Sequence, residues 1–294
     1  MNTDSVNMPD HPDFLCVGAQ KAATSWLYGS LKRLPGLFLP VVKESHFFRE
    51  TSVTPFAWAG GLRRGQSEKL LGVYRQRSDL TGEHRHIEAQ LRHYSAELVD
   101  EAWYRQVFSF AEPGDLRGEV CPSYFGLPAY DIERVNAINP EVRIVLLVRD
   151  PVDRIWSGIR MHKKQRGGAV DLDRLIADPD ALRIFIDYTR YSEAIPCWRA
   201  GVGDRLRVVL FDDIAERPRE TLGEILDHIG YRGSPGLPKA RPPMNVGEPT
   251  PMPIGYRERL YTLLKSQYAF LETIDPVRVA QWRMKHEGAL QSAA

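Results

Sequence analysis

The chain has 294 residues, with 39 Lys and Arg against 38 Asp and Glu, so its formal net charge is +1. This balance argues against a generic nucleic-acid coat protein or a polybasic membrane binder, and 43% hydrophobic with 26% charged residues is typical of a globular protein. Three scattered cysteines exclude a disulfide framework and favour a reducing, cytoplasmic compartment.

Short apolar runs alternate along the chain with segments of helical spacing. In chain order we expect a strand at 14–17, a helix at 24–34, a strand at 37–39, a helix at 91–110, strands at 118–120 and 143–148, a helix beginning at Pro151, a helix at 181–198, a strand at 206–211, and helices at 218–229 and 256–271. This alternation predicts an α/β fold, with a central parallel sheet and helices on both of its faces.

The other segments are polar or rich in proline. Residues 1–12 are expected to be a flexible tail without the apolar core of a secretory signal, and no apolar run is long enough to cross a membrane. Residues 51–90 are polar with some helix, and residues 232–253 hold seven prolines and are expected to form a loop. Because no repeat or linker is visible, residues 13–294 are interpreted as a single domain.

The first motif lies between the first strand and the first helix and reads Gly18-Ala-Gln-Lys21-Ala-Ala-Thr24-Ser25-Trp26. A helix N-terminus presents unpaired N–H groups to an anion, and Lys21 adds a full positive charge. The motif is not a Walker A loop, in which Lys directly precedes Ser or Thr, because Lys21 precedes Thr24 by three residues. The equally favoured alternative is an ordinary turn with one exposed lysine.

The second motif follows the most apolar strand and reads Arg149-Asp150-Pro151-Val-Asp153-Arg154-Ile-Trp-Ser157. It falls at the carboxyl edge of the sheet, where open α/β folds bind ligands. Arg149 can present a bidentate guanidinium to a phosphate, and Ser157, two turns into the helix, can donate to the same group. The alternative for Arg149 is an ion pair with Asp150 or Asp153, and Arg154 is interpreted as structural.

The third motif, Lys43-Glu44-Ser45-His46-Phe47-Phe48, places a carboxylate beside a lysine and a histidine. Such a carboxylate can act as a general base toward a hydroxyl or an amine. Taken alone, the segment fits better with a solvated loop whose two phenylalanines anchor it to the core.

In this order the three motifs resemble the sulfotransferases that use 3′-phosphoadenosine 5′-phosphosulfate, whose fold is P-loop-like and binds a nucleotide. The first resembles the family's 5′-phosphosulfate loop and the second its 3′-phosphate motif. The third is similar to Lys-Glu-Pro-His-Phe-Phe of the heparan-sulfate-type and related bacterial branch. The resemblance runs from about Phe14 to Gly230. Further similar segments are Arg92-His-Tyr94 through Trp103-Tyr104, Glu119-Val-Cys121-Pro-Ser-Tyr124-Phe125, and Tyr191 through Trp198.

Three positions depart from the family pattern. Ala23 replaces a usual glycine, Ser45 replaces proline and Cys121 replaces threonine. Alanine would be strained if position 23 needed a positive φ, so we expect a turn compatible with alanine. The charged groups are unchanged.

The resemblance implies that Glu44 takes the proton of the acceptor and that Lys21 stabilises charge on the leaving phosphate. It assigns the 3′-phosphate to Arg149 and Ser157. Residues expected at the 5′-phosphate loop are Gln20, Lys21, Ala22, Ala23, Thr24 and Ser25.

Other residues carry open alternatives. Trp26 could stack on adenine or belong to the core, and Tyr191 could contact the nucleotide or pack internally. Arg241 could close over the 3′-phosphate. Lys43 could contact donor or acceptor, while His46, which can share one side of an extended segment with Glu44, is favoured as a substrate or support residue over a base.

The implied acceptor is a small molecule, a glycan or a natural product with a hydroxyl, or alternatively an amine. No nucleic-acid partner and no metal are expected, since the eight histidines lack zinc-site spacing. The basic residues of 51–115 would admit an acidic sugar. Alternative functions are a nucleotide-dependent phosphotransferase and a nucleotide-binding protein without turnover.

Overall fold

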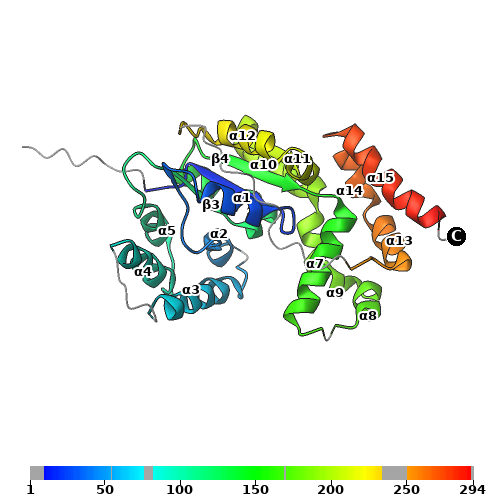
Figure 1. Ribbon diagram of the computed structural model, residues 1–294, viewed down its shortest axis with the longest axis horizontal. Helices are drawn as coiled ribbons and strands as arrows, with labels where there is room; N and C mark the ends of the chain where they lie inside the picture. Colours follow the sequence, from blue (N-terminus) through cyan, green and yellow to red (C-terminus); the bar gives the residue numbers. More distant parts are fainter. Residues whose placement is uncertain (1–9, 54, 76–81, 169, 234–249, 293–294) are drawn as a thin grey trace, which may run out of the picture.

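A computed structural model describes residues 10–53, 55–75, 82–168, 170–233 and 250–292. Five strands within them form a parallel sheet in the order β2-β3-β1-β4-β5, which confirms the predicted α/β fold (Figure 1). The strands are β1 (Phe14–Gly18), β2 (Leu37–Phe38), β3 (Leu116–Val120), β4 (Arg143–Val148) and β5 (Leu206–Leu210).

Helices connect the strands and lie on both faces of the sheet. The right-handed rule for crossovers between parallel strands places α1 on one face and α6 and α10, which contact each other, on the other. The described helices are α1 (Thr24–Leu31), α2 (Phe47–Glu50), α3 (Ala59–Arg75), α4 (Gly82–Tyr94), α5 (Glu101–Phe108), α6 (Ala129–Ile138), α7 (Pro151–Gln165), α8 (Leu172–Ala177), α9 (Pro179–Ile186), α10 (Tyr191–Val202), α11 (Phe211–Glu216), α12 (Pro218–Ile229), α13 (Ile254–Leu263), α14 (Lys265–Leu271) and α15 (Pro276–Gln291).

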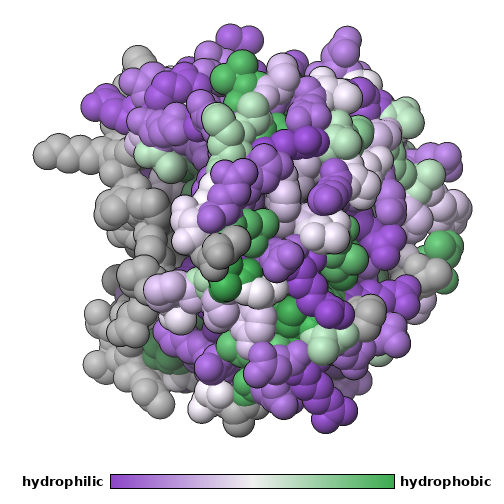
Figure 2. Space-filling view, turned by 90° about the vertical axis from the view of Figure 1, so that its right-hand side faces the viewer, coloured by the Kyte–Doolittle hydropathy of each residue, from purple (hydrophilic) through white to green (hydrophobic). Residues whose placement is uncertain are grey.

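Two groups of helices lie at opposite ends of the molecule. Figure 1 shows α3, α4 and α5 at one end and α8, α9, α13, α14 and α15 at the other, with the sheet between them. The face formed at the second end is mostly hydrophilic, with hydrophobic residues in small separate groups (Figure 2).

The strand order brings the candidate motifs together. β1 lies between β3 and β4, so the segments that follow these strands meet at one edge of the sheet. Ala19 N donates to Leu147 O at 2.8 Å, and Cys121 N donates to Cys16 O at 2.9 Å, which ties the three strand ends together. The first two motifs, 123 residues apart at their closest, are therefore neighbours.

Burial explains why the strands were readable from the sequence. All five residues of β1, and all of β4 except Arg143, are buried, as expected for central strands covered by helices on both sides. Such strands consist of continuous apolar runs, and β4 has the predicted bounds.

Three predicted helices are wrong in extent, because each is interrupted within its predicted range. The helix expected at 91–110 is broken after α4, and Asp100 caps α5 by accepting a hydrogen bond from Trp103 N at 2.7 Å. The helix at 181–198 is interrupted by a 3₁₀ turn at Asp187–Thr189, and the one at 256–271 divides into α13 and α14. The last helix, α15, was not predicted.

The ends of the predicted domain are only partly described. Residues 1–9 of the expected tail and most of the expected loop, residues 234–249 with Arg241, lie outside the described residues. Asp10 forms an ion pair with Arg105 at 3.0 Å, and Pro12 O accepts from Asn139, so residues 10–12 contact the domain. Among the helices described, none is long and apolar enough to cross a membrane.

Candidate active site at the carboxyl edge of the sheet

The turn after β1 adopts an unusual backbone conformation. Lys21 has φ 70° and Ala23 has φ 75°, so the expectation that position 23 suits alanine is wrong. A left-handed residue is needed there because the chain must reverse between a buried strand and a helix that begins at Thr24, and glycine would meet this need without a steric cost. Ala23 provides no side-chain cap, so side chains of this turn leave the first N–H groups of α1 available.

A cluster of cations surrounds Lys21. Burial lowers the pKa of its ammonium, and nearby positive charges lower it further, which shows that the group lies in a positive field. These charges belong to Arg149, Arg160, Lys43 and Arg154. A bound anion would relieve this repulsion, so the cluster favours a phosphate or sulfate ligand.

Arg149 joins the second motif to the first. Its Nη1 donates to Lys21 O at 3.0 Å, its Cζ lies 4.4 Å from the ring centre of Phe211, and its backbone N donates to the Tyr191 hydroxyl at 3.2 Å. Among the described carboxylates none lies within 4.0 Å of its guanidinium, so the alternative of an ion pair with Asp150 or Asp153 is wrong. Burial lowers its pKa, and the guanidinium nevertheless stays charged.

Asp150 is the cap of α7 instead. Its carboxylate accepts from two backbone amides of the helix, from the Tyr268 hydroxyl at 2.8 Å and from His286 Nε2 at 2.7 Å. Burial would raise the pKa of Asp150, but the bond from His286 and the other partners lower it on balance. Asp150, Asp153 and His286 also lie close enough to hold a metal ion. However, Arg257 donates to His286 Nδ1, so Nε2 carries the proton and offers no lone pair.

Four other predicted residues are placed by packing. Arg154 is fully buried and bonds Gln20 O and Thr189 Oγ1, as its structural interpretation expected. Trp26 and Tyr191 are 3% and 0% exposed, which favours the packing alternative for both rings. Ser157 lies on the buried side of α7.

The third motif lies next to the first. Lys43 Nζ is 3.4 Å from Thr24 Oγ1 and 2.8 Å from Glu44 Oε1, so one ammonium bridges the start of α1 and the carboxylate. The Glu44 side chain is 24% exposed and can therefore be reached from solvent. Its other oxygen, Oε2, is 3.8 Å from His46 Nε2.

His46 is a buried histidine with one nitrogen directed toward Glu44. Nδ1 is 3.0 Å from Ser123 Oγ, whereas Nε2 has no hydrogen-bond partner among the described residues. Burial lowers the pKa of His46, so its imidazole is neutral at pH 7. A neutral ring beside Glu44 can share a proton with that carboxylate or with a bound hydroxyl.

Glu119 supports this segment, and sequence reasoning gave it no role. It lies at the end of β3, is 1% exposed, and accepts from Ser45 N and from the Tyr104 hydroxyl, each at 2.8 Å. Burial raises the pKa of Glu119 although these donors oppose the shift. The contacts fix Ser45 between Glu44 and His46. The feature of the sequence that could have identified Glu119 is the position of an acidic residue within an expected buried strand.

Comparison with known proteins identifies relatives of this arrangement. The model of the sulfotransferase family matches residues 12–235. Carbohydrate sulfotransferase 15 of Mus musculus is 24% identical over 196 residues, and that of Rattus norvegicus is 23% identical over 194. Each match covers 60% of this chain and 32% of the relative, so the chain spans about a third of their length.

A solved structure has a similar fold. The sulfotransferase from Alicyclobacillus acidocaldarius is 21% identical, with a TM-score of 0.67 over 93% of this chain and 99% of that one.

Proposed function

The chain belongs to the sulfotransferase family, and we propose that it transfers a sulfuryl group from 3′-phosphoadenosine 5′-phosphosulfate to an acceptor hydroxyl. The observation that carries this proposal is the position of Lys43. Its ammonium contacts both Thr24, at the start of the helix beside the cation cluster, and Glu44, the only carboxylate of the third motif. An anion site and a carboxylate base are thus held side by side.

The cation cluster fits a donor with two separate phosphates. Lys21 and the N–H groups of 22–25, with the hydroxyls of Thr24 and Ser25, would hold the 5′-phosphate. Arg149 and Ser157 would hold the 3′-phosphate. Trp26 has no part in adenine stacking in this proposal, because its ring is buried in the core.

The transfer makes one oxygen–sulfur bond and breaks another. Glu44 accepts the proton of the acceptor hydroxyl as its oxygen attacks sulfur in line with the leaving phosphate. Lys21 stabilises the negative charge that grows on the oxygen bridging sulfur and phosphorus. Lys43 orients Glu44, and neutral His46 supports its second oxygen.

The two alternative functions require different residues in the site. A phosphotransferase of the Walker type needs a hydroxyl directly after the lysine to hold magnesium, and here Ala22 occupies that position. A nucleotide-binding protein without turnover has no need of Glu44. The alternatives are therefore separated by ligand preference and by catalysis.

Two measurements test the proposal. 3′-Phosphoadenosine 5′-phosphate should raise the melting temperature, because it binds only the folded state, whereas ATP with magnesium should raise it less. Labelled sulfate should pass from the donor to a hydroxylated acceptor. Stabilisation by ATP with magnesium alone would overturn the proposal, and bisphosphate binding without transfer to any hydroxylated or amine acceptor would favour the non-catalytic alternative.

A further inference from the structure

A patch of exposed aromatic side chains lies beside the candidate base. Phe56 and Trp58, which we call the aromatic shelf, are 38% and 41% exposed, and their ring centres are 5.4 Å apart. Val53 and Leu62, three residues before Phe56 and four after Trp58 in the sequence, are also exposed, at 60% and 48%. Contiguous exposed apolar surface is a mark of a binding site.

The shelf is fixed to the site by specific contacts. The Trp58 ring meets the ring of His46 edge to face, with centres 5.4 Å apart, and the same imidazole lies 3.8 Å from Glu44. Phe56 N donates to Arg49 O at 3.0 Å, and the Arg49 guanidinium lies 4.6 Å from the Phe56 ring centre. A single side chain, His46, therefore separates the shelf from the base.

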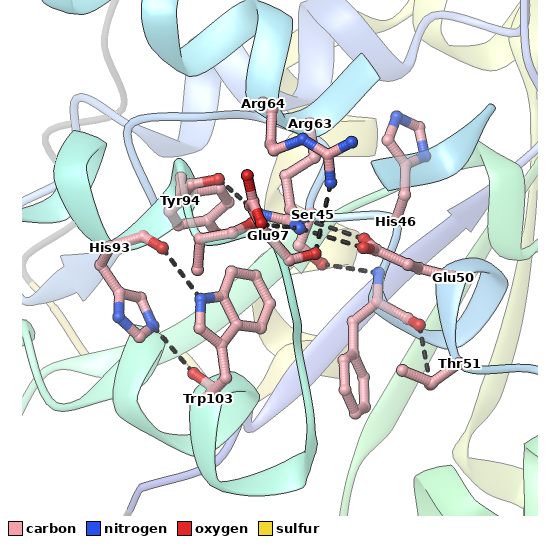
Figure 3. Close-up of polar contacts among 12 residues, drawn as sticks. Ser45, His46, Glu50, Thr51, Arg63, Arg64, His93, Tyr94, Glu97 and Trp103 are labelled. Carbon is pink, nitrogen blue, oxygen red and sulfur yellow. Dashed lines mark hydrogen bonds and ion pairs between the residues drawn. The ribbon is translucent and has the colours of Figure 1, made fainter. Parts of the chain in front are cut away.

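Several basic side chains on this side of the molecule have partners within the protein. Arg63 is fully buried, pairs with Glu50 at 3.0 Å, and donates to Tyr94 O (Figure 3). It also donates to Ala96 O at 2.8 Å. His93 lies 2.9 Å from Trp103 O, as the same figure shows.

Two further arginines also have partners within the protein. Arg92 pairs with Glu88 at 2.5 Å, and Arg64 donates to Glu97 O at 3.3 Å. Arg63 and His93 thus stabilise the contacts among α2, α3, α4 and α5, whereas the Arg92 pair lies within α4. All four of these basic side chains therefore have partners within the protein.

We propose that the aromatic shelf binds an aromatic ring of the acceptor, so that the enzyme sulfates hydroxylated aromatic compounds. This inference rests on the proposed function and specifies its acceptor. The ring packs on Phe56 and Trp58 while its hydroxyl lies at Glu44. The O–H proton passes to Glu44, the phenolic oxygen bonds to sulfur, and 3′-phosphoadenosine 5′-phosphate leaves with the electron pair of the broken S–O bond.

The test compares three acceptors with labelled donor: 2-naphthol, methyl β-galactoside and a chondroitin oligosaccharide. We expect sulfation of 2-naphthol with the highest kcat/KM. The W58A variant should raise the KM for 2-naphthol about tenfold, the loss expected for one aromatic contact of about 1.5 kcal/mol. The KM for the donor should stay unchanged, and W58F should recover most of the affinity.

Tyr130 provides a matched control, because it is an aromatic residue 55% exposed on α6. The Y130A variant should leave both KM values unchanged. Preference for the galactoside or the oligosaccharide, or an unchanged KM for 2-naphthol in W58A, would overturn the shelf assignment while leaving the transferase intact. Failure to bind 3′-phosphoadenosine 5′-phosphate would instead overturn the proposed function itself.

Discussion

The proposed donor side and the proposed acceptor side of the site differ in how their basic residues are used. Residues 14–43 carry four basic and no acidic side chains, whereas residues 44–115 carry nine basic and eleven acidic ones. On the donor side Lys21 lies among positive charges, and neither Lys21 nor Arg149 forms an ion pair with a described carboxylate. On the acceptor side Arg63 and Arg92 pair with Glu50 and Glu88. Basic side chains without an ion-pair partner thus indicate an anion-binding site, whereas paired ones indicate a structural role.

The exposure of aromatic side chains also differs between the two sides. On the donor side the aromatic residues Trp26 and Tyr191 are buried, and charge faces the site. On the acceptor side the charges are mostly satisfied, and Phe56 and Trp58 are exposed. The first region is therefore suited to an anionic ligand and the second to an apolar one. The following substitutions test whether this division holds.

The largest effect is expected at the boundary of the two regions. E44Q removes the base, so turnover should fall roughly 10²–10⁴-fold while binding of 3′-phosphoadenosine 5′-phosphate is retained. Steady-state rates and calorimetric binding measure the two separately. Near-normal turnover in E44Q would transfer the base role to His46.

The next effect distinguishes the two sets of arginines. R149A should weaken binding of 3′-phosphoadenosine 5′-phosphate roughly 10- to 100-fold, because a hydrogen bond to a charged group contributes about 1.5–3 kcal/mol. The matched variant R92A, on the acceptor side, should bind the nucleotide normally. Calorimetry on both variants checks this, and equal losses would erase the distinction between the regions.

A smaller effect is expected from the C-terminal helices. H286A removes a donor to Asp150, the residue next to Arg149, and should lower nucleotide affinity about fivefold through one lost hydrogen bond of about 1 kcal/mol. H286Q, whose amide can donate to Asp150, should recover the affinity.

His228 is the control for that change, since it is a partly buried histidine whose Nε2 lies 3.1 Å from Ile144 O. H228A should lower the melting temperature without changing nucleotide affinity. A loss of affinity in H228A equal to that in H286A would mean that general stability, and not the Asp150 contact, is responsible.

The smallest effect concerns the backbone of the donor loop. Glycine relieves the left-handed strain at position 23 but increases the entropy of the unfolded chain, so A23G should raise the free energy of unfolding by about 0.5 kcal/mol. Chemical denaturation measures it. Gly230, with φ 81°, is the reciprocal control, and G230A should destabilise. Destabilisation by A23G would show that the loop tolerates alanine.

Much of the fold was predictable because the relevant patterns are local. The strand at 143–148 and the helix from Pro151 follow from an apolar run and a proline in the first turn. The break at Asp100 was missed because helical periodicity continues on both sides of it, and only the cap geometry identifies the boundary. Glu119 was missed because two of its donors, Ser45 N and the Tyr104 hydroxyl, come from other segments of the chain.

By itself the sequence determined the alternation of strands and helices, the three motifs and the positive charge of the turn after β1, since each depends on residues close together in the chain. The tertiary structure decided which charged side chains form ion pairs. It placed β1 between β3 and β4, brought Arg149 to Lys21, paired Arg63 with Glu50 and exposed Trp58 beside His46. These outcomes depend on packing between segments far apart in the chain, because a side chain's partners, and hence its available charge, are set by the whole fold.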